Sequence, residues 1–173
     1  MRRFILTGAP GAGKTAIVRE LEARGFPVVE EAATDVIARK QAAGVDEPWL
    51  EARFIAEITK LQDFRRKTAL AGPVQFHDRS IFCTLALARY LGHPVPDVLA
   101  TALSETKAAF EPQVFFVRLL GFIVMTDARR IDLAEAQRFE AVHEAVYREH
   151  GFTLLPVEPA PIAVRVATIL DEV

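Results

Sequence analysis

A glycine-rich octet directly after the first apolar run constrains the fold of this chain more than any other feature. The octet reads Gly8-Ala9-Pro10-Gly11-Ala12-Gly13-Lys14-Thr15. It fits the pattern G-x-x-x-x-G-K-[ST] at every fixed position, and that pattern requires a strand before it and a helix after it. Residues 4–7 are short and apolar, as a buried parallel strand is, and apolar residues recur at helical spacing over 14–24. The sequence therefore predicts a strand–loop–helix unit at residues 4–24.

The octet also predicts a phosphate-binding site. Its glycines let the backbone curl so that successive N–H groups point inward, and the following helix directs its positive dipole end to the same place. Lys14 is expected to reach the β- and γ-phosphates, and the Thr15 hydroxyl to ligate Mg²⁺. The alternative is a glycine-rich turn before a surface helix, but a chance match in a chain of this length is on the order of one in a hundred. We interpret residues 8–15 as a P-loop for ATP or GTP with Mg²⁺.

Strands and helices alternate along the rest of the chain. Further strands are expected at 26–29, 74–77, 114–120 and 153–157, and further helices at 32–43, 48–70, 80–91, 96–110, 131–149 and 161–170. Such alternation implies a parallel sheet with helices on both faces, which is a three-layer α/β fold. A length of 173 residues, with no internal repeat or linker, fits one domain over residues 1–173.

Charge and composition exclude several function classes. The formal net charge of −2 gives no general attraction to nucleic acid or to anionic lipid. The longest apolar stretch, 114–125, is interrupted by Arg118 and is too short to span a membrane. Cys83 is the only cysteine, which excludes an intrachain disulfide and suits a reducing compartment. With no secretory signal at residues 1–7, we expect a cytoplasmic monomer or homodimer that binds neither nucleic acid nor membrane.

Charged residues follow three of the expected strands. In open parallel sheets, ligands collect beyond the carboxyl ends of the strands. Asp78 could hold the Mg²⁺ shell and Arg79 could grip a phosphate; the alternative is a surface pair at a helix start. Glu30 or Glu31 could take the proton from an attacking hydroxyl, and the residues alone do not separate the two acids from each other or from helix-start acids.

Two further groups are candidates for ligand contacts. Arg129 and Arg130, in an irregular segment, could close over the phosphates, the alternative being a solvated basic turn. Trp49, Phe54 and Phe64 on the expected long helix could line a pocket for a base or sugar, although such a stripe is more often core. The four histidines share no metal-ligand spacing, so they are expected to be ordinary packing or surface residues.

Several segments in this order resemble the single-domain AAA ATPases grouped with the ribosylnicotinamide kinase domain of NadR. They are F-I-L-T-G-A-P-G-A-G-K-T from residue 4, G-F-P-V-V-E-E-A-A from residue 25, F-H-D-R-S from residue 76, D-A-R-R from residue 127 and Y-R-E-H-G-F from residue 147. The resemblance covers nearly the whole chain. It implies a P-loop NTPase fold of the nucleoside and nucleotide kinase type, with a five-stranded parallel sheet in the order 2-3-1-4-5.

The resemblance also implies roles for single residues. It favours Glu31 over Glu30 as the acid near the acceptor, and it places a polar acceptor contact on Gln62. The candidate catalytic residues are then Lys14, Glu31, Asp78, Arg79, Arg129 and Arg130. Thr15 and Asp78 are the candidate metal ligands, and Glu31, Gln62 and Arg79 the candidate acceptor contacts.

Two functions remain open from the sequence. The first is a small-molecule kinase that transfers the γ-phosphate of Mg·ATP to a nucleoside, nucleotide or related metabolite, because positioning and charge neutralisation are most of what phosphoryl transfer needs. The second is a regulatory nucleotide switch or slow ATPase that acts through a protein partner. The switch predicts that side chains fill the crevice beside Glu31 and that residues 121–130 change order with the nucleotide.

Overall fold

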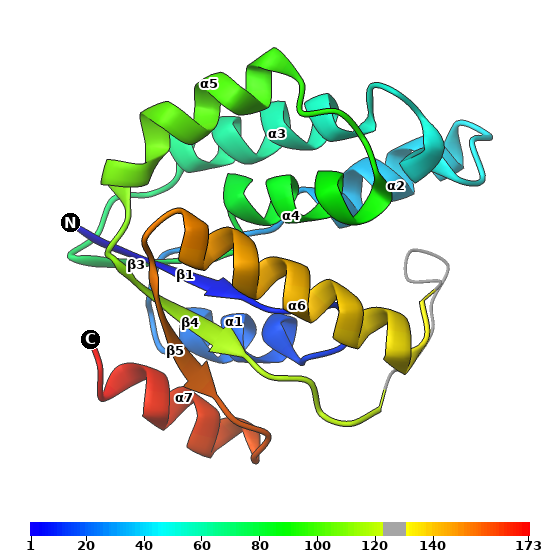
Figure 1. Cartoon of the computed structure of the whole chain (residues 1–173). Coiled ribbons are helices and arrows are strands. Elements are labelled where there is room, and N and C mark those ends of the chain that lie inside the picture. The colour runs from blue at the N-terminus through cyan, green and yellow to red at the C-terminus, as the bar shows by residue number, and fades with distance from the viewer. Residues whose placement is uncertain (123–130) are drawn as a thin grey trace.

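The computed structural model describes residues 1–122 and 131–173, and its centre is one parallel sheet (Figure 1). The five strands are β1 (Arg2–Thr7), β2 (Val28–Val29), β3 (Val74–Asp78), β4 (Gln113–Val117) and β5 (Thr153–Val157). Their order is β2-β3-β1-β4-β5, and each neighbouring pair is parallel. The predicted fold class and strand order are confirmed. The chain crosses from one side of β1 to the other between β3 and β4, so the topological switch point lies at the end of β1, where the octet begins.

Helices cover both faces of this sheet. On one face lie α1 (Lys14–Ala23) and α7 (Ile162–Leu170), which contact each other. The other face carries α2 (Ala33–Ala42), α3 (Phe54–Thr68), α4 (Ile81–Leu91), α5 (Asp97–Thr106) and α6 (Leu133–Glu149) (Figure 1). Two short 3-10 helices, η1 (Pro48–Leu50) and η2 (Lys107–Ala109), precede α3 and β4. Among the described residues, no helix has the length and apolar composition needed to cross a membrane.

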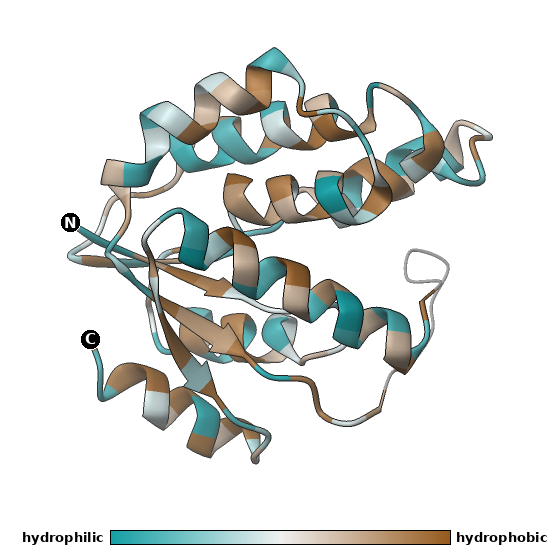
Figure 2. Cartoon of the chain, in the orientation of Figure 1, coloured by the Kyte–Doolittle hydropathy of each residue, from teal (hydrophilic) through white to brown (hydrophobic). Residues whose placement is uncertain are grey.

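The apolar strands explain why both faces are covered. Along β1 the side chain of Ile5 packs into the core under α3, α4 and α6, whereas Phe4 and Leu6 pack into the second core under α1 and α7. All three side chains are buried. Figure 2 shows β1 as hydrophobic beyond its hydrophilic first residues, and β4 as mostly hydrophobic. Near-continuous apolar runs of this kind are typical of parallel strands that are dry on both sides.

The predicted helix at 48–70 is wrong at its first turn. The chain forms η1, then Glu51 adopts an extended backbone (φ −76°, ψ 136°), and α3 begins only at Phe54. Leu50 stands four residues before Phe54, the spacing of one helical stripe, but it is 68% exposed because the extended Glu51 breaks its helical register with α3. Phe64 is 62% exposed; ten residues after Phe54, it is rotated by roughly 80° from Phe54 around the axis of α3.

Candidate functional site

The octet of residues 8–15 forms a tight loop between β1 and α1. Gly8 has a φ of 134°, and a Cβ added there would lie 2.3 Å from the carbonyl oxygen of Val117 on β4. The loop therefore passes too close to β4 for any side chain at this position. Lys14 folds back over the loop, and its Nζ donates to the carbonyl oxygens of Gly8 and Ala9 at 3.0 and 2.8 Å.

Five members of the predicted nucleotide-binding set line one cavity: Pro10, Gly11, Gly13, Lys14 and Thr15. Ala9 and Ala12 are buried, and their contribution to the loop is its backbone. The cavity has a volume of about 770 Å³ and runs from the loop to the space between α2, α3, α4 and α6. The loop and the carboxyl ends of β2 and β3 thus open into one continuous space.

Burial shifts the pKa values of two charged side chains beside the loop, Lys14 and Asp78, toward their neutral forms. It lowers the pKa of Lys14 to about 7, with the nearby Arg79 guanidinium acting in the same direction. Burial also raises the pKa of Asp78 to about 6. The Oδ1 atom of Asp78 is buried and has no hydrogen-bond partner among the described residues. A buried, unpartnered oxygen beside a weakened ammonium group fits a site that a polyphosphate and a cation complete.

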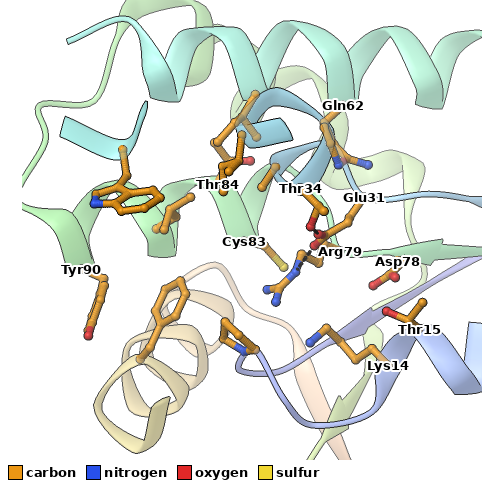
Figure 3. Close-up of a pocket in the computed structure, with 18 of the residues that line it drawn as sticks. Lys14, Thr15, Glu31, Thr34, Gln62, Asp78, Arg79, Cys83, Thr84 and Tyr90 are labelled. Atoms are coloured by element: carbon orange, nitrogen blue, oxygen red, sulfur yellow. Dashed lines mark hydrogen bonds and ion pairs between the residues drawn. The ribbon is translucent and has the colours of Figure 1, made fainter. Parts of the chain in front are cut away.

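The oxygen donors beside Lys14 fit Mg²⁺. Figure 3 shows the Asp78 carboxylate and the Thr15 side chain close to Lys14 on the phosphate side of the cavity. Both are hard oxygen ligands, which Mg²⁺ prefers. Within residues 1–122 and 131–173, no group of three or more His, Cys, Asp and Glu side chains could hold a metal. Mg²⁺ needs only one or two protein ligands where phosphates and water supply its remaining oxygen ligands.

Glu31 and Arg79 form an ion pair on the other side of Lys14 (Figure 3). The Arg79 Nε donates to Glu31 Oε2 at 2.6 Å, and the Thr34 hydroxyl donates to the other carboxylate oxygen. Burial alone would raise the pKa of Glu31, but Arg79, the Thr34 hydrogen bond and Lys14 together hold it below its ordinary value. Glu31 is therefore ionised at neutral pH. Glu30, by contrast, is exposed and does not line the cavity.

His143 on α6 holds the same arginine from a second side. Its Nδ1 lies 2.9 Å from the carbonyl oxygen of Phe139, so this nitrogen carries the proton. Its Nε2 then accepts from Nη1 of Arg79 at 3.2 Å. Burial and the Arg79 charge hold the pKa of His143 well below its ordinary value, so the ring is neutral. The prediction that His143 is an ordinary packing residue missed this contact, because a helical histidine 64 positions from the arginine gives no sequence signal.

The backbone of Arg79 is itself unusual. It is the one residue other than glycine with a positive φ (67°) among the described residues. The Arg79 N–H donates to the carbonyl oxygen of Leu6 at 2.9 Å, which fixes the turn after β3 against β1. A left-handed arginine costs conformational energy and persists where its surroundings determine it. The turn aims the guanidinium into the cavity.

Gln62 lines the cavity but is already bonded to the main chain. Its Oε1 accepts from the N–H of Ala32 at 3.0 Å, and its Nε2 donates to the carbonyl oxygen of Glu30 at 3.4 Å. The buried carboxamide thus ties α3 to the segment between β2 and α2. The expected role of Gln62 as an acceptor contact stays a prediction.

Some of the other residues expected at the site line the cavity. Trp49 and Phe54 line the cavity, whereas Phe64 does not. Arg129 and Arg130 lie outside the described residues, so their role over the phosphates stays a prediction. Sequence reasoning missed Thr84 and Tyr90 on α4 and Phe139 on α6, which also line the cavity. The position of Thr84 about one turn after the Asp-Arg pair was the available signal; Tyr90 and Phe139 gave none, because it is the packing of α4 against α6 that brings them to the cavity.

A family model described as an AAA domain matches residues 3–165. No curated protein sequence matches the chain. Among solved structures, a deoxyadenosine kinase from M. mycoides with products dCMP and a flexible dCDP bound has a TM-score of 0.69 at 13% identity, covering 98% of this chain and 97% of that one.

NadR is similar over part of its length. NadR in complex with NAD and AMP-PNP has a TM-score of 0.71 at 15% identity, covering 98% of this chain and 49% of that one. NadR in complex with NR gives a TM-score of 0.72 at 14% identity, so this chain spans about half of NadR. At these identities the likeness shows the fold. Together with the match over residues 3–165, it establishes that the chain belongs to the AAA domain family and has the P-loop fold found in these kinases.

Proposed function

We propose that this protein is a small-molecule kinase that transfers the γ-phosphate of Mg·ATP or Mg·GTP to an acceptor held in the cavity. The observation that carries the proposal is one open space lined by Lys14 and Thr15 of the P-loop and by the Glu31–Arg79 pair. The names of the similar structures, a deoxyadenosine kinase and a NadR complexed with AMP-PNP, support the same reaction class.

Lys14, Glu31 and Arg79 each have a role in transferring the γ-phosphate. Lys14 exchanges its two carbonyl contacts for the β- and γ-phosphates. The acceptor hydroxyl lies against Glu31; its oxygen bonds to the γ-phosphorus, and its proton passes to the Glu31 carboxylate. The bond from the γ-phosphorus to the β–γ bridging oxygen breaks, and its electron pair leaves with the nucleoside diphosphate. Arg79, held by Glu31 and His143, neutralises charge on the transferred group.

Thr15 and Asp78 would hold the Mg²⁺, directly or through water. When bound, the ion neutralises charge on the phosphate oxygens. The pKa of Asp78, raised by burial to about 6, leaves the carboxylate mostly ionised at neutral pH and able to meet a cation.

The open cavity favours a kinase over a regulatory switch or slow ATPase. A switch predicts that side chains fill the space beside Glu31, but that residue lines the cavity of about 770 Å³. An enzyme that only hydrolyses ATP has no need for a second chamber beyond the site of the base and phosphates of ATP. The acceptor chamber is the feature that separates the two functions.

The test measures formation of the nucleoside diphosphate with Mg·ATP or Mg·GTP in the presence of nucleosides, nucleotides and small alcohols. A kinase produces diphosphate only when its acceptor is present, and that acceptor further raises the melting temperature of the complex with a non-hydrolysable ATP analogue. Lys14→Ala should abolish both effects, while the exposed Lys60→Ala on α3 should leave them unchanged. Diphosphate formation at a rate independent of every acceptor would favour the ATPase.

A further inference from the structure

The far end of the cavity differs in chemistry from its phosphate end. Beyond Glu31, most of the lining consists of aliphatic and aromatic side chains from α2, η1, α3, α4 and α6, and the carboxylates of Glu47 and Glu135 also line the cavity. We name this part the apolar chamber and define it by Ile37, Trp49, Ile58, Leu87, Tyr90 and Phe139. The Tyr90 and Phe139 rings stack at a centroid distance of 4.6 Å and an interplanar angle of 28°, which gives the chamber one flat aromatic wall.

The polar groups between the two ends are already paired within the protein. Glu31 and Arg79 bind each other, and both polar atoms of the Gln62 side chain are bonded to the main chain. Figure 3 shows Gln62 near Glu31 and Thr34, with Tyr90 at the opposite side of the cavity. Gln62 is therefore poorly placed to form hydrogen bonds with the part of a ligand that fills the apolar chamber.

Among the described residues, few polar atoms remain for a ligand in the chamber. Thr84 and Tyr90 line the cavity, and their hydroxyls form no hydrogen bond with the described part of the chain. Glu47 is exposed, and the Glu135 carboxylate accepts from the N–H of Asp132. A nucleobase carries donors and acceptors along its ring edges, and each one left unpaired in a buried pocket loses its hydrogen bonds to water. A body with at most one or two polar atoms avoids that loss and gains from apolar burial.

We propose that the acceptor is an alcohol carried on an apolar body, aromatic or branched hydrocarbon, that fills the apolar chamber. This inference rests on the proposed kinase function. The hydroxyl lies against the Glu31 carboxylate; its oxygen bonds to the γ-phosphorus, its proton passes to Glu31, and the bond to the β–γ bridging oxygen breaks as the nucleoside diphosphate leaves. The chamber selects the body of the acceptor by excluding ligands that need many hydrogen bonds.

The single tryptophan of the chain makes the chamber directly observable. Trp49 lines the cavity at its apolar end and is the only tryptophan in the sequence. The experiment titrates the wild-type protein, saturated with Mg²⁺ and AMP-PNP, with 2-phenylethanol, geraniol, adenosine and deoxycytidine. It follows tryptophan fluorescence, and parallel assays with Mg·ATP measure ADP and the phosphate ester. The first two compounds distinguish an aromatic from an isoprenoid body.

At least one of the two alcohols should change the fluorescence saturably, with a Kd about ten-fold or more below that of either nucleoside, and should be phosphorylated. Leu87→Gln places a polar group in the chamber and should weaken that alcohol about ten-fold while stabilisation by AMP-PNP is retained. The matched control is Leu50→Gln, since Leu50 adjoins Trp49 but is 68% exposed and outside the cavity lining.

The outcomes separate this inference from the kinase proposal. Phosphorylation of a nucleoside, with neither alcohol bound nor phosphorylated, overturns the apolar acceptor and leaves the kinase function standing. Binding of AMP-PNP with no acceptor of either class phosphorylated, and no fluorescence response, overturns both. The wild-type titration decides these cases even if Leu87→Gln fails to fold.

Discussion

At the scale of single residues, the site combines groups whose ordinary charges do not fit a buried protein interior. Lys14 is 6% exposed, and burial lowers its pKa to about 7, whereas Asp78 beside it has its pKa raised to about 6. Such opposed shifts are common where a protein prepares a place for a charged ligand. The ligand then restores the ordinary charge states.

The Lys14 ammonium should take up a proton when a nucleotide binds. In the free protein at pH 8, a pKa of about 7 leaves Lys14 mostly neutral, and a polyphosphate raises that pKa. Binding at pH 8 should therefore take up roughly one proton, and affinity should fall as the pH rises above 7. Asp78, with a pKa of about 6, is already ionised at pH 8 and contributes little. Calorimetry in Tris and HEPES buffers measures the uptake; a binding heat independent of the buffer contradicts it.

Glu31 should be required for transfer but not for nucleotide binding. Glu31→Gln removes the carboxylate that receives the proton and that orients Arg79, so we expect turnover to fall by about 10²- to 10⁴-fold. The melting-temperature increase with AMP-PNP should remain. The matched control is Glu30→Gln, because Glu30 is exposed and contributes only its carbonyl oxygen to Gln62 and Arg65. Unchanged turnover in Glu31→Gln would remove this residue from the mechanism.

At the scale of elements, the P-loop depends on how closely it approaches β4. The β1–β4 pairing brings Val117 against Gly8, and the space between them excludes a Cβ. The same pairing sets the height at which the loop presents its N–H groups. A loop sequence that matches the P-loop pattern thus needs its neighbouring strand in this register to work.

Gly8→Ala should be far more damaging than an equally strained glycine substitution elsewhere. Both Gly8 and Gly44 have positive φ, but only at Gly8 does a new Cβ meet backbone, at 2.3 Å. Gly44→Ala should cost about 1–2 kcal/mol from the backbone conformation alone. Gly8→Ala should cost about 2 kcal/mol more than that and abolish nucleotide binding. Urea unfolding and nucleotide titration test this, and equal losses in the two variants would show that the contact with Val117 is unimportant.

At the scale of the whole molecule, the last helix supports the first loop. Arg165 on α7 is 1% exposed; its Nη1 donates to the carbonyl oxygen of Ala12 at 2.9 Å and its Nη2 to that of Arg118 at 3.3 Å. Burial lowers the pKa of this arginine. One side chain therefore connects α7, the P-loop and the end of β4, across 153 positions of sequence.

Removing this arginine should destabilise the protein and loosen the loop. Arg165→Met keeps the apolar bulk but leaves two carbonyl oxygens unpaired, which should reduce the free energy of unfolding by about 2–4 kcal/mol. Affinity for AMP-PNP should fall with it. Arg138→Met on α6 is the control, since the Arg138 side chain is 64% exposed. Chemical denaturation measures the difference, and equal stability of the two variants would mean that Arg165 does not support the loop.

Much of the fold followed from local patterns in the sequence. The octet, the apolar strands and the alternation of elements predicted a parallel sheet with helices on both faces, and the family resemblance implied the five strands and their order, which the structure confirms. The prediction that the long helix begins at residue 48 was wrong because the backbone of Glu51 is extended. The helical spacing between Leu50 and Phe54 does not reveal this break.

The sequence by itself determined the P-loop and the presence of acids and an Asp-Arg pair at strand ends, since those depend on neighbouring residues and on the period of the apolar pattern. Only the tertiary structure decided that His143 supports Arg79, that Gln62 is bonded to the main chain and that Arg165 supports the P-loop. These contacts join residues dozens of positions apart. They depend on how helices pack and where side chains point, and no local pattern carries that information.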